Sequence, residues 1–329
     1  MIPAPKSVRD TPFDSGIGHL SLIRLGRHCM GTRWEIVVPA GAKDAVPWAD
    51  NAFDALAEEE SRLSVFLQES EVSRLNRLPV GASRRLSDEL FDLLERCSVW
   101  WGQTEGCLDV AVGGMIEGWG FLHGPPRVPE TVQRESWVAE GGISRLSLDG
   151  KRKTATWLGA SGGLNLGAVG KGFGLDRMAG ILRGAGWQSV MIHGGRSSVL
   201  ARGIPPGESQ GWRVALRHPA RDSVLAEVEL ANQAMGTSAA TYKHLEHEGK
   251  RLGHVLDPRT AWPVMDTQAV SVLAPDAAEA DALSTAIFVG GQALAEKLVQ
   301  DREDLGVLYM PTEGPVRLLG AMAHRFHLL

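Results

Sequence analysis

Cysteine is scarce in this sequence. Only Cys29, Cys97 and Cys107 occur among its 329 residues, and no two of them show the Cys-x-x-Cys spacing of a metal or redox motif. An odd number of cysteines without that spacing argues against a disulfide framework and against a zinc site. We therefore expect three free thiols, buried as small hydrophobic side chains.

Long apolar runs are also missing. No segment approaches the roughly 20 apolar residues of a membrane-spanning helix, and residues 1–10 lack the apolar stretch of a secretory signal. The sequence therefore predicts a cytoplasmic protein without a membrane segment. We expect residues 1–20 to form a poorly ordered extension and residues 21–329 to form the folded domain.

An excess of positive charge is absent as well. Lys and Arg number 34 against 39 Asp and Glu, which gives a net charge of −5, and the basic residues are spread along the chain. This distribution argues against a nucleic-acid partner. Hydrophobic residues make up 43% of the chain, which suffices for the core of a globular protein.

The spacing of apolar residues predicts helices mixed with paired strands. Helical periodicity is present in residues 46–66, 86–101 and 175–182, and a last helix is expected from Asp276 through Phe288, stopping at Gly290-Gly291. Strands are expected at residues 33–38, 146–148, 154–157, 190–192, 212–216 and 224–230. Because strand pairs dominate over strand-helix alternation, we expect an α+β fold of antiparallel sheets packed with helices in a single compact domain.

Glycine and proline predict the turns between these elements. Asp149-Gly150 is expected to form a two-residue hairpin turn, and Gly186 is expected to cap the helix that precedes it. The segments 125–135 and 205–210 are expected to be surface loops because of their proline content.

Residues 165–176 begin with a glycine-rich turn that ends in Lys171 and should open a helix. Free backbone N–H groups and a positive helix end together suit a phosphate group. The segment is not a Walker A loop, which needs a glycine at the position of Asn165 and Ser or Thr after Lys171, and it contains no Gly-x-Gly-x-x-Gly. Taken alone, it fits a plain strand-to-helix turn whose glycines permit close packing at least as well.

Asp281 and Thr285 are four residues apart on a predicted helix, so both side chains should emerge on one face. Two oxygens placed in this way suit Mg²⁺, which takes its remaining ligands from water and substrate phosphates. The alternative is an Asp favoured by the helix dipole and a Thr that bonds to its own helix.

His254 and Asp257 precede Pro258, which disfavours a helix and predicts a strand-to-turn junction. A histidine there can donate to a diphosphate or take a proton from a hydroxyl. Asp257 is expected to orient it. An isolated histidine is more often a structural residue, so this interpretation depends on the motifs around it.

Segments of this kind occur together, in a fixed order, in one protein family. The segments in this chain are Met30-Gly31-Thr32, Ser64-Val65-Phe66 with Ser70-Glu71, Gly106-Cys107-Leu108-Asp109, residues 165–172, Gly194-Gly195, Thr237-Ser238, His254 to Thr260, and Ala280-Asp281-Ala282 with Thr285. The set resembles the ApbE-type flavin transferases (FAD:protein FMN transferases). The resemblance spans roughly residues 28–310.

The resemblance implies an activity and a set of site residues. The activity is Mg²⁺-dependent cleavage of FAD, with transfer of FMN through its phosphate to a Thr or Ser of a partner flavoprotein and release of AMP. His254, Asp281 and Lys171 are the implied catalytic residues. Mg²⁺ would be bound by Asp281, Thr285 and the carbonyl of Ala168. The implied FAD contacts are Met30, Phe66, Cys107, Leu108, Asp109, Asn165, Lys171 and His254.

The sequence departs from the family pattern in three ways. Asn165 and Arg196 stand where the family usually has Asp, and many relatives carry an export signal. An amide can still contact a ligand, although one negative charge near the metal is lost. Two alternative functions therefore stay open: an FAD pyrophosphatase that uses water as acceptor, and a flavin-binding protein without turnover.

Overall fold

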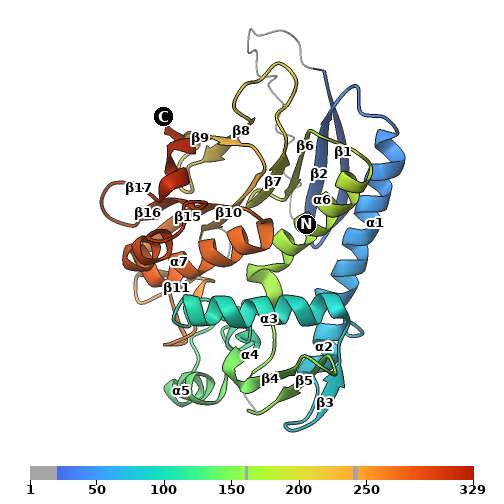
Figure 1. The fold of residues 1–329 in the computed structure, drawn as a ribbon. Coiled ribbons are helices and arrows are strands. Elements are labelled where there is room, and N and C mark those ends of the chain that lie inside the picture. The colour runs from blue at the N-terminus through green and yellow to red at the C-terminus, as the bar shows by residue number, and fades with distance from the viewer. Residues whose placement is uncertain (1–20, 160–161, 240–243) are drawn as a thin grey trace, which may run out of the picture.

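The computed structural model describes residues 21–159, 162–239 and 244–329. The extension expected at residues 1–20 lies outside the described residues. Figure 1 shows a large sheet with helices packed against it and a smaller group of helices and strands below. No helix in the described ranges has both the length and the apolar character needed to cross a membrane.

The largest sheet has eight strands in the order β1-β2-β6-β7-β10-β15-β16-β17, and every neighbouring pair is antiparallel. Its strands are β1 (Leu22–Cys29), β2 (Thr32–Pro39), β6 (Val190–Gly194), β7 (Ser198–Arg202), β10 (Gln233–Ala239), β15 (Thr267–Ala274), β16 (Gly306–Pro311) and β17 (Arg317–Leu319). The prediction of an α+β fold with antiparallel sheets is confirmed.

Each face of this sheet carries a separate apolar core. Helices α1 (Ala45–Leu63), α6 (Gly170–Gly184) and α7 (Ala277–Val299) cover one face (Figure 1). A three-stranded sheet of β8 (Trp212–Arg217), β9 (Val224–Leu230) and β18 (Phe326–Leu328) covers the other face, and the short helix η3 (Ala321–Arg325) precedes β18. The result is a three-layer arrangement with α6 and α7 in the helical layer.

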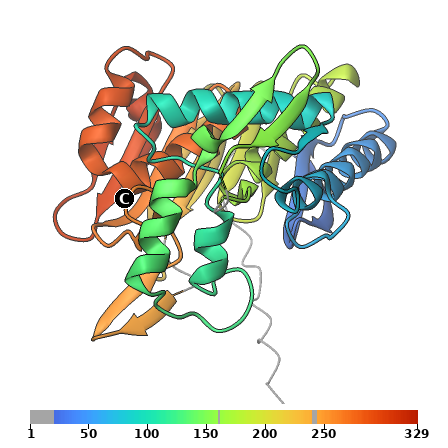
Figure 2. The same cartoon turned by 90° about the horizontal axis from the view of Figure 1, so that it is seen from below.

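The remaining elements form two smaller groups. Helices α2 (Glu71–Asn76) and α3 (Asp88–Gln103) pack with a sheet of β3 (Ser83–Arg85), β4 (Leu146–Asp149) and β5 (Thr154–Trp157), and with the short helices η1 (Ile143–Arg145) and η2 (Leu166–Ala168). Helices α4 (Gly113–Gly118) and α5 (Thr131–Glu140) share a core with the hairpins β11 (His244–His247)–β12 (Lys250–Gly253) and β13 (Leu256–Asp257)–β14 (Trp262–Pro263). Figure 2 shows the orange β11–β12 hairpin beside the green helices.

Two local predictions were wrong. The turn between β4 and β5 has four residues, 150–153, rather than two. Its positive φ, of 51°, falls on Lys153 and not on Gly150. The segment expected to be a loop up to Glu135 becomes helical at Thr131, where the helix buries Trp137 against Gly118. The predicted stop of the last helix at Gly290-Gly291 is confirmed as a break, because Gly291 has a φ of 71°; the further helical segment that follows, up to Val299, was not predicted. The cap at Gly186, with a φ of 77°, is confirmed.

Asp176 joins the helices α6 and α7. Its carboxylate accepts hydrogen bonds from the backbone N–H groups of Ala277 and Ala278, both at 2.9 Å, and so caps the start of α7. Burial, together with the nearby charge of Asp276, raises the pKa of Asp176 to about 7. The position of α7 therefore depends on a carboxylate that is difficult to ionise.

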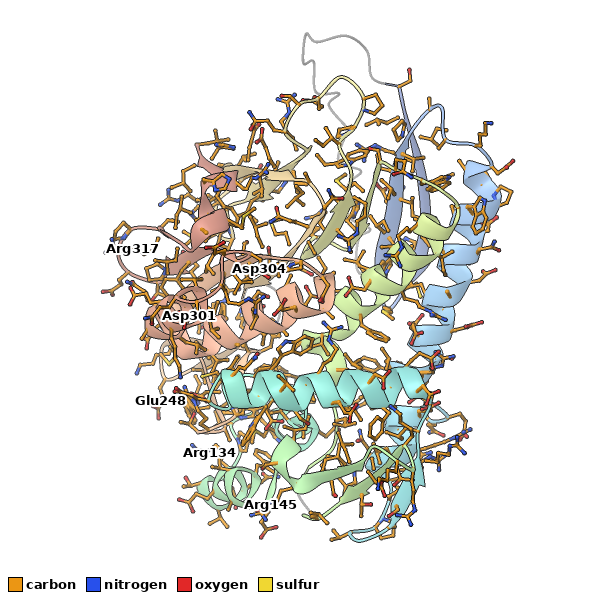
Figure 3. All side chains as sticks on the ribbon, viewed as in Figure 1. Arg134, Arg145, Glu248, Asp301, Asp304 and Arg317 are labelled. Carbon is orange, nitrogen blue, oxygen red and sulfur yellow. The ribbon has the colours of Figure 1, made fainter. Side chains whose placement is uncertain are left out.

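A pH dependence of stability follows from this raised pKa. Between about pH 4 and pH 7 the folded protein retains a proton on Asp176 that the unfolded chain has lost, so the free energy of unfolding should fall as pH rises. The slope attributable to this group is at most about 1.4 kcal/mol per pH unit. Asp176→Asn should remove that slope in urea unfolding experiments across this range. The control is Asp301→Asn, at an exposed position just beyond α7 (Figure 3), and equal slopes in the parent and in Asp176→Asn would contradict the assignment.

Candidate active site

The site is built around a close crossing of α6 and α7. A Cβ atom on Gly172 of α6 would lie 2.0 Å from the carbonyl oxygen of Ala277 in α7. Strand β10 approaches α7 as closely, because a Cβ on its Gly236 would lie 2.5 Å from the backbone of Ala280. Only glycine permits this approach at either position. The packing role considered for the glycine-rich loop is therefore real, and the same crossing brings Asp281 to the start of α6.

Asp281 lies at the bottom of the crossing, with 5% of its surface exposed. Its Oδ2 atom accepts the backbone N–H of Gly172 at 2.8 Å, and the hydroxyl of Ser198 donates to Oδ1 at 2.8 Å. Burial raises the pKa of Asp281 to about 6, while the charge of Lys171 and both hydrogen bonds oppose this rise. A carboxylate in this position is well oriented but lacks enough positive charge to compensate its burial, which suits an added cation.

Three oxygen donors are available to such a cation. In a continuous helix the Gly172 N–H would point to the carbonyl of Ala168, but here it donates to Asp281, which leaves the Ala168 carbonyl available. The hydroxyl of Thr285, one turn beyond Asp281, lies 3.1 Å from the hydroxyl of Ser238. A carboxylate, a hydroxyl and a carbonyl are the hard ligands that Mg²⁺ prefers, so these residues fit the expected ion.

The protein supplies only part of a coordination shell. Across residues 21–159, 162–239 and 244–329 no group of three or more His, Cys, Asp or Glu side chains is placed to hold a metal ion. Any Mg²⁺ at Asp281 would therefore take further ligands from water and from substrate oxygens, as is usual where the ion acts on phosphates.

Asn165 and Lys171 bracket the glycine-rich turn as the sequence predicts. The side-chain oxygen of Asn165 accepts the Gly167 N–H at 3.0 Å and caps η2, while its backbone N–H donates to Val110 at 2.7 Å. Lys171 is half-buried in the first turn of α6, close enough to lower the pKa of Asp281. The start of α6 therefore combines a positive helix end with a lysine side chain.

Met30 and Phe66 are placed differently from each other. Met30 forms the β1–β2 turn with a φ of 48°, and its methyl group lies 3.7 Å from where a Cβ of Gly174 would stand, beside α6. Phe66 follows α1 with 63% of its surface exposed, and its ring meets that of His123 edge-on at 5.7 Å. An aromatic ring this exposed is available to a planar ligand.

The side chains of Cys107, Leu108 and Asp109 are buried. Asp109 accepts backbone N–H groups from Ala111 at 2.7 Å and from Ile143 at 3.0 Å, so its carboxylate holds the turn together. A ligand at this turn would meet mainly its backbone. Cys29, Cys97 and Cys107 are all free and buried, as the sequence predicts.

His254 is half-buried between β12 and β13, at the strand-to-turn junction expected before Pro258. The orienting role of Asp257 stays a prediction. Its carboxylate is held by Arg259, with Nε at 2.9 Å and Nη2 at 2.8 Å. A guanidinium group binds a carboxylate through two parallel hydrogen bonds, so Arg259 occupies both oxygens of Asp257.

Ser198 is the site residue that the sequence analysis missed. It lies on β7 and its side chain reaches Asp281, 83 positions away in the chain. A lone serine in a strand carries no spacing signal, so only the fold identifies it. Arg196, which stands where the family usually has Asp, is exposed in the turn between β6 and β7.

Comparison with characterised sequences is consistent with this geometry. The FAD:protein FMN transferase of Haemophilus influenzae is 31% identical over 268 residues, which cover 77% of this chain and 75% of that protein. The FAD:protein FMN transferase of Escherichia coli is 28% identical over 292 residues, which cover 87% of this chain and 83% of that protein.

Comparison with solved structures supports the fold. The flavinyl transferase ApbE of Pseudomonas stutzeri, in its apo form, has a TM-score of 0.81 at 25% identity, covering 93% of this chain and 97% of that one. The ApbE protein of Thermotoga maritima has a TM-score of 0.83 at 24% identity, covering 90% of this chain and 96% of that one. A family model described as the ApbE family matches residues 30–309. The chain therefore belongs to the ApbE family, as its motifs predict.

Proposed function

We propose that this protein is a Mg²⁺-dependent FAD:protein FMN transferase. It cleaves the diphosphate of FAD, attaches FMN through its phosphate to a Thr or Ser of a partner flavoprotein, and releases AMP. The names of its relatives support this activity. The observation that carries the proposal is the buried carboxylate of Asp281, held against the glycine-rich start of α6 next to Lys171.

Each residue then has a defined task. Asp281, Thr285 and the Ala168 carbonyl would hold Mg²⁺, which when bound neutralises charge on the diphosphate oxygens. Lys171 stabilises the negative charge that develops on the bridging oxygen as its bond to the FMN phosphorus breaks and AMP leaves with that oxygen. His254 contacts the diphosphate or takes the proton from the acceptor hydroxyl as its oxygen bonds to the FMN phosphorus.

The remaining residues of the proposed site bind the rest of FAD. Phe66 offers an exposed ring and Met30 a flexible thioether, both suited to planar ring systems. Asn165 and the turn at residues 107–109 contact the ligand beside the glycine-rich loop. These contacts place the diphosphate at the start of α6, with the FMN phosphorus facing outward to an incoming protein hydroxyl.

The test is to incubate the protein with FAD and Mg²⁺, with and without a flavoprotein acceptor. AMP is followed by chromatography, and the acceptor by its mass after denaturation. A transferase produces AMP together with acceptor that keeps FMN through denaturation. Free FMN in full yield, with acceptor in excess, would make the protein a pyrophosphatase. FAD binding without AMP would make it a flavin-binding protein.

Thr285→Val tests the weaker of the two side-chain metal ligands. The substitution keeps the shape of the side chain but deletes the hydroxyl oxygen, so turnover should fall roughly tenfold at low Mg²⁺. Excess Mg²⁺ should restore part of this loss, because mass action compensates for a weakened site. Steady-state rates measured across a Mg²⁺ titration decide the question, and a curve identical to that of the parent would remove Thr285 from the site.

A further inference from the structure

Ser198 is a buried hydroxyl group that directly contacts the carboxylate of the proposed metal site. We infer that Ser198 is a positioning residue that fixes the Asp281 carboxylate for a divalent cation. This inference rests on the proposed function for the identity of the ion and deepens it by adding a residue outside the family motifs.

The contact between the two side chains is close and fully enclosed. Ser198 has no exposed surface, and its Oγ atom lies 2.8 Å from Oδ1 and 3.0 Å from Oδ2 of Asp281. The second fixed donor is the Gly172 N–H on α6, at 2.8 Å from Oδ2. One donor from the sheet and one from a helix thus hold the plane of the carboxylate from two directions.

The position of Ser198 in the sheet explains why its side chain contacts Asp281. In the strand register, Ser198 pairs with Gly194 on β6 and with Gly236 on β10. A Cβ on Gly194 would collide with the Trp34 ring at 2.8 Å, and one on Gly236 would collide with the start of the Asp281 turn. Ser198 therefore lies between two glycines, and the same row continues to Trp34 on β2 and Val272 on β15, so Ser198 is the one polar side chain among these five residues.

The Asp281 carboxylate keeps a lone pair that an ion could use. A carboxylate offers about four lone-pair positions, and two donors are found within the described residues: the one Ser198 hydroxyl proton, which is nearer to Oδ1 than to Oδ2, and the Gly172 N–H on Oδ2. One position on Oδ1 stays open on an oxygen whose orientation is already set. Orientation of a ligand by such hydrogen bonds typically changes metal affinity 10- to 100-fold, roughly.

Removal of the hydroxyl should therefore weaken ion binding. Ser198→Ala leaves Asp281 with the Gly172 N–H as its remaining fixed donor, so the carboxylate can rotate and is less stable in its ionised form. We expect the dissociation constant for a divalent cation to rise roughly 10-fold or more. Ser198→Thr keeps the hydroxyl and should recover most of the affinity.

Mn²⁺ is the probe, because its free concentration can be measured by electron paramagnetic resonance without any turnover. The full-length parent, Ser198→Ala, Ser198→Thr and Ser271→Ala are titrated with Mn²⁺ in the absence of FAD. Ser271 is the matched control: it is also buried, in strand β15 of the same sheet, but its hydroxyl pairs with that of Thr237 at 2.8 Å. Circular dichroism and thermal unfolding establish that each variant is folded.

The expected result is weaker Mn²⁺ binding in Ser198→Ala, recovery in Ser198→Thr and no change in Ser271→Ala. Unchanged affinity in Ser198→Ala, equal losses in Ser198→Ala and Ser271→Ala, or no measurable Mn²⁺ binding by the parent would each overturn the inference. AMP release from FAD by the parent is measured separately. Parent protein that binds Mn²⁺ but releases no AMP would refute the proposed function while leaving the role of Ser198 intact.

Discussion

Asp281→Asn is expected to lower the rate of FAD cleavage by more than roughly 100-fold while the protein remains folded. The substitution removes a charged residue that would bind the metal directly. Substitution of a residue that only contacts a metal ligand already lowers metal affinity or activity roughly 10- to 100-fold. The amide fits the site sterically. Its oxygen can accept the Gly172 N–H, and its NH₂ group can donate to the hydroxyl of Ser198, both of which contact the carboxylate in the parent.

The same variant should be more stable than the parent in the absence of metal. Burial raises the pKa of Asp281 from 3.8 to about 6, so its ionised form costs about 3 kcal/mol of folding free energy at neutral pH. The free energy of unfolding of the parent in EDTA should fall as pH rises from about 4 to 6, and Asp281→Asn should lose the part of this fall that is due to Asp281 while keeping the part that is due to Asp176.

AMP release at matched Mg²⁺ and urea unfolding in EDTA measure the two effects. Asp281→Ala serves as the second variant and should lose the same activity, although it leaves the Gly172 and Ser198 donors without their partner. Activity retained in both variants would remove Asp281 from the site. Lost activity combined with lowered stability in Asp281→Asn would show that the carboxylate is structural instead.

Lys171→Met should reduce FMN transfer and FAD hydrolysis together, each by roughly 100- to 1000-fold. Lysine in the first turn of α6 supplies a fixed positive charge where the diphosphate is expected, and loss of one preorganised charge or donor from a transition state has this size of effect. Both acceptors, water and a protein hydroxyl, need the same leaving group to be stabilised. Methionine preserves the length and the apolar stem of the side chain.

The readout for Lys171→Met is the ratio of acceptor-bound FMN to free FMN, with AMP as the total. A constant ratio at a reduced total supports a role at the phosphate. A variant that lost transfer but kept hydrolysis would show that Lys171 serves the partner protein. Lys43→Met, at an exposed lysine before α1, is the control and should match the parent.

Local patterns in the sequence predicted much of this molecule because they depend on near neighbours. The amphipathic spacing predicted α1, α3 and α6, and the four-residue separation of Asp281 and Thr285 correctly placed both on α7. The break at Gly291 was predicted as well, but the helical segment after it was not, for the opposite reason. Glycine in a sequence signals freedom to leave the helix, but whether the chain resumes a helix afterwards depends on what the next turn packs against: Leu294 and Ala295, both buried.

The sequence by itself determined the family, the order of the site motifs and the antiparallel α+β class, because these are encoded in residue types and their spacing. Only the tertiary structure decided which groups surround Asp281. Ser198 reaches it through the strand register, and Gly172 reaches it through a helix crossing. The tertiary structure also shows that the Asp257 carboxylate binds the guanidinium group of Arg259. A hydrogen bond requires two groups within about 3 Å, and between residues far apart in the chain that distance exists only once the sheet and the helices have packed.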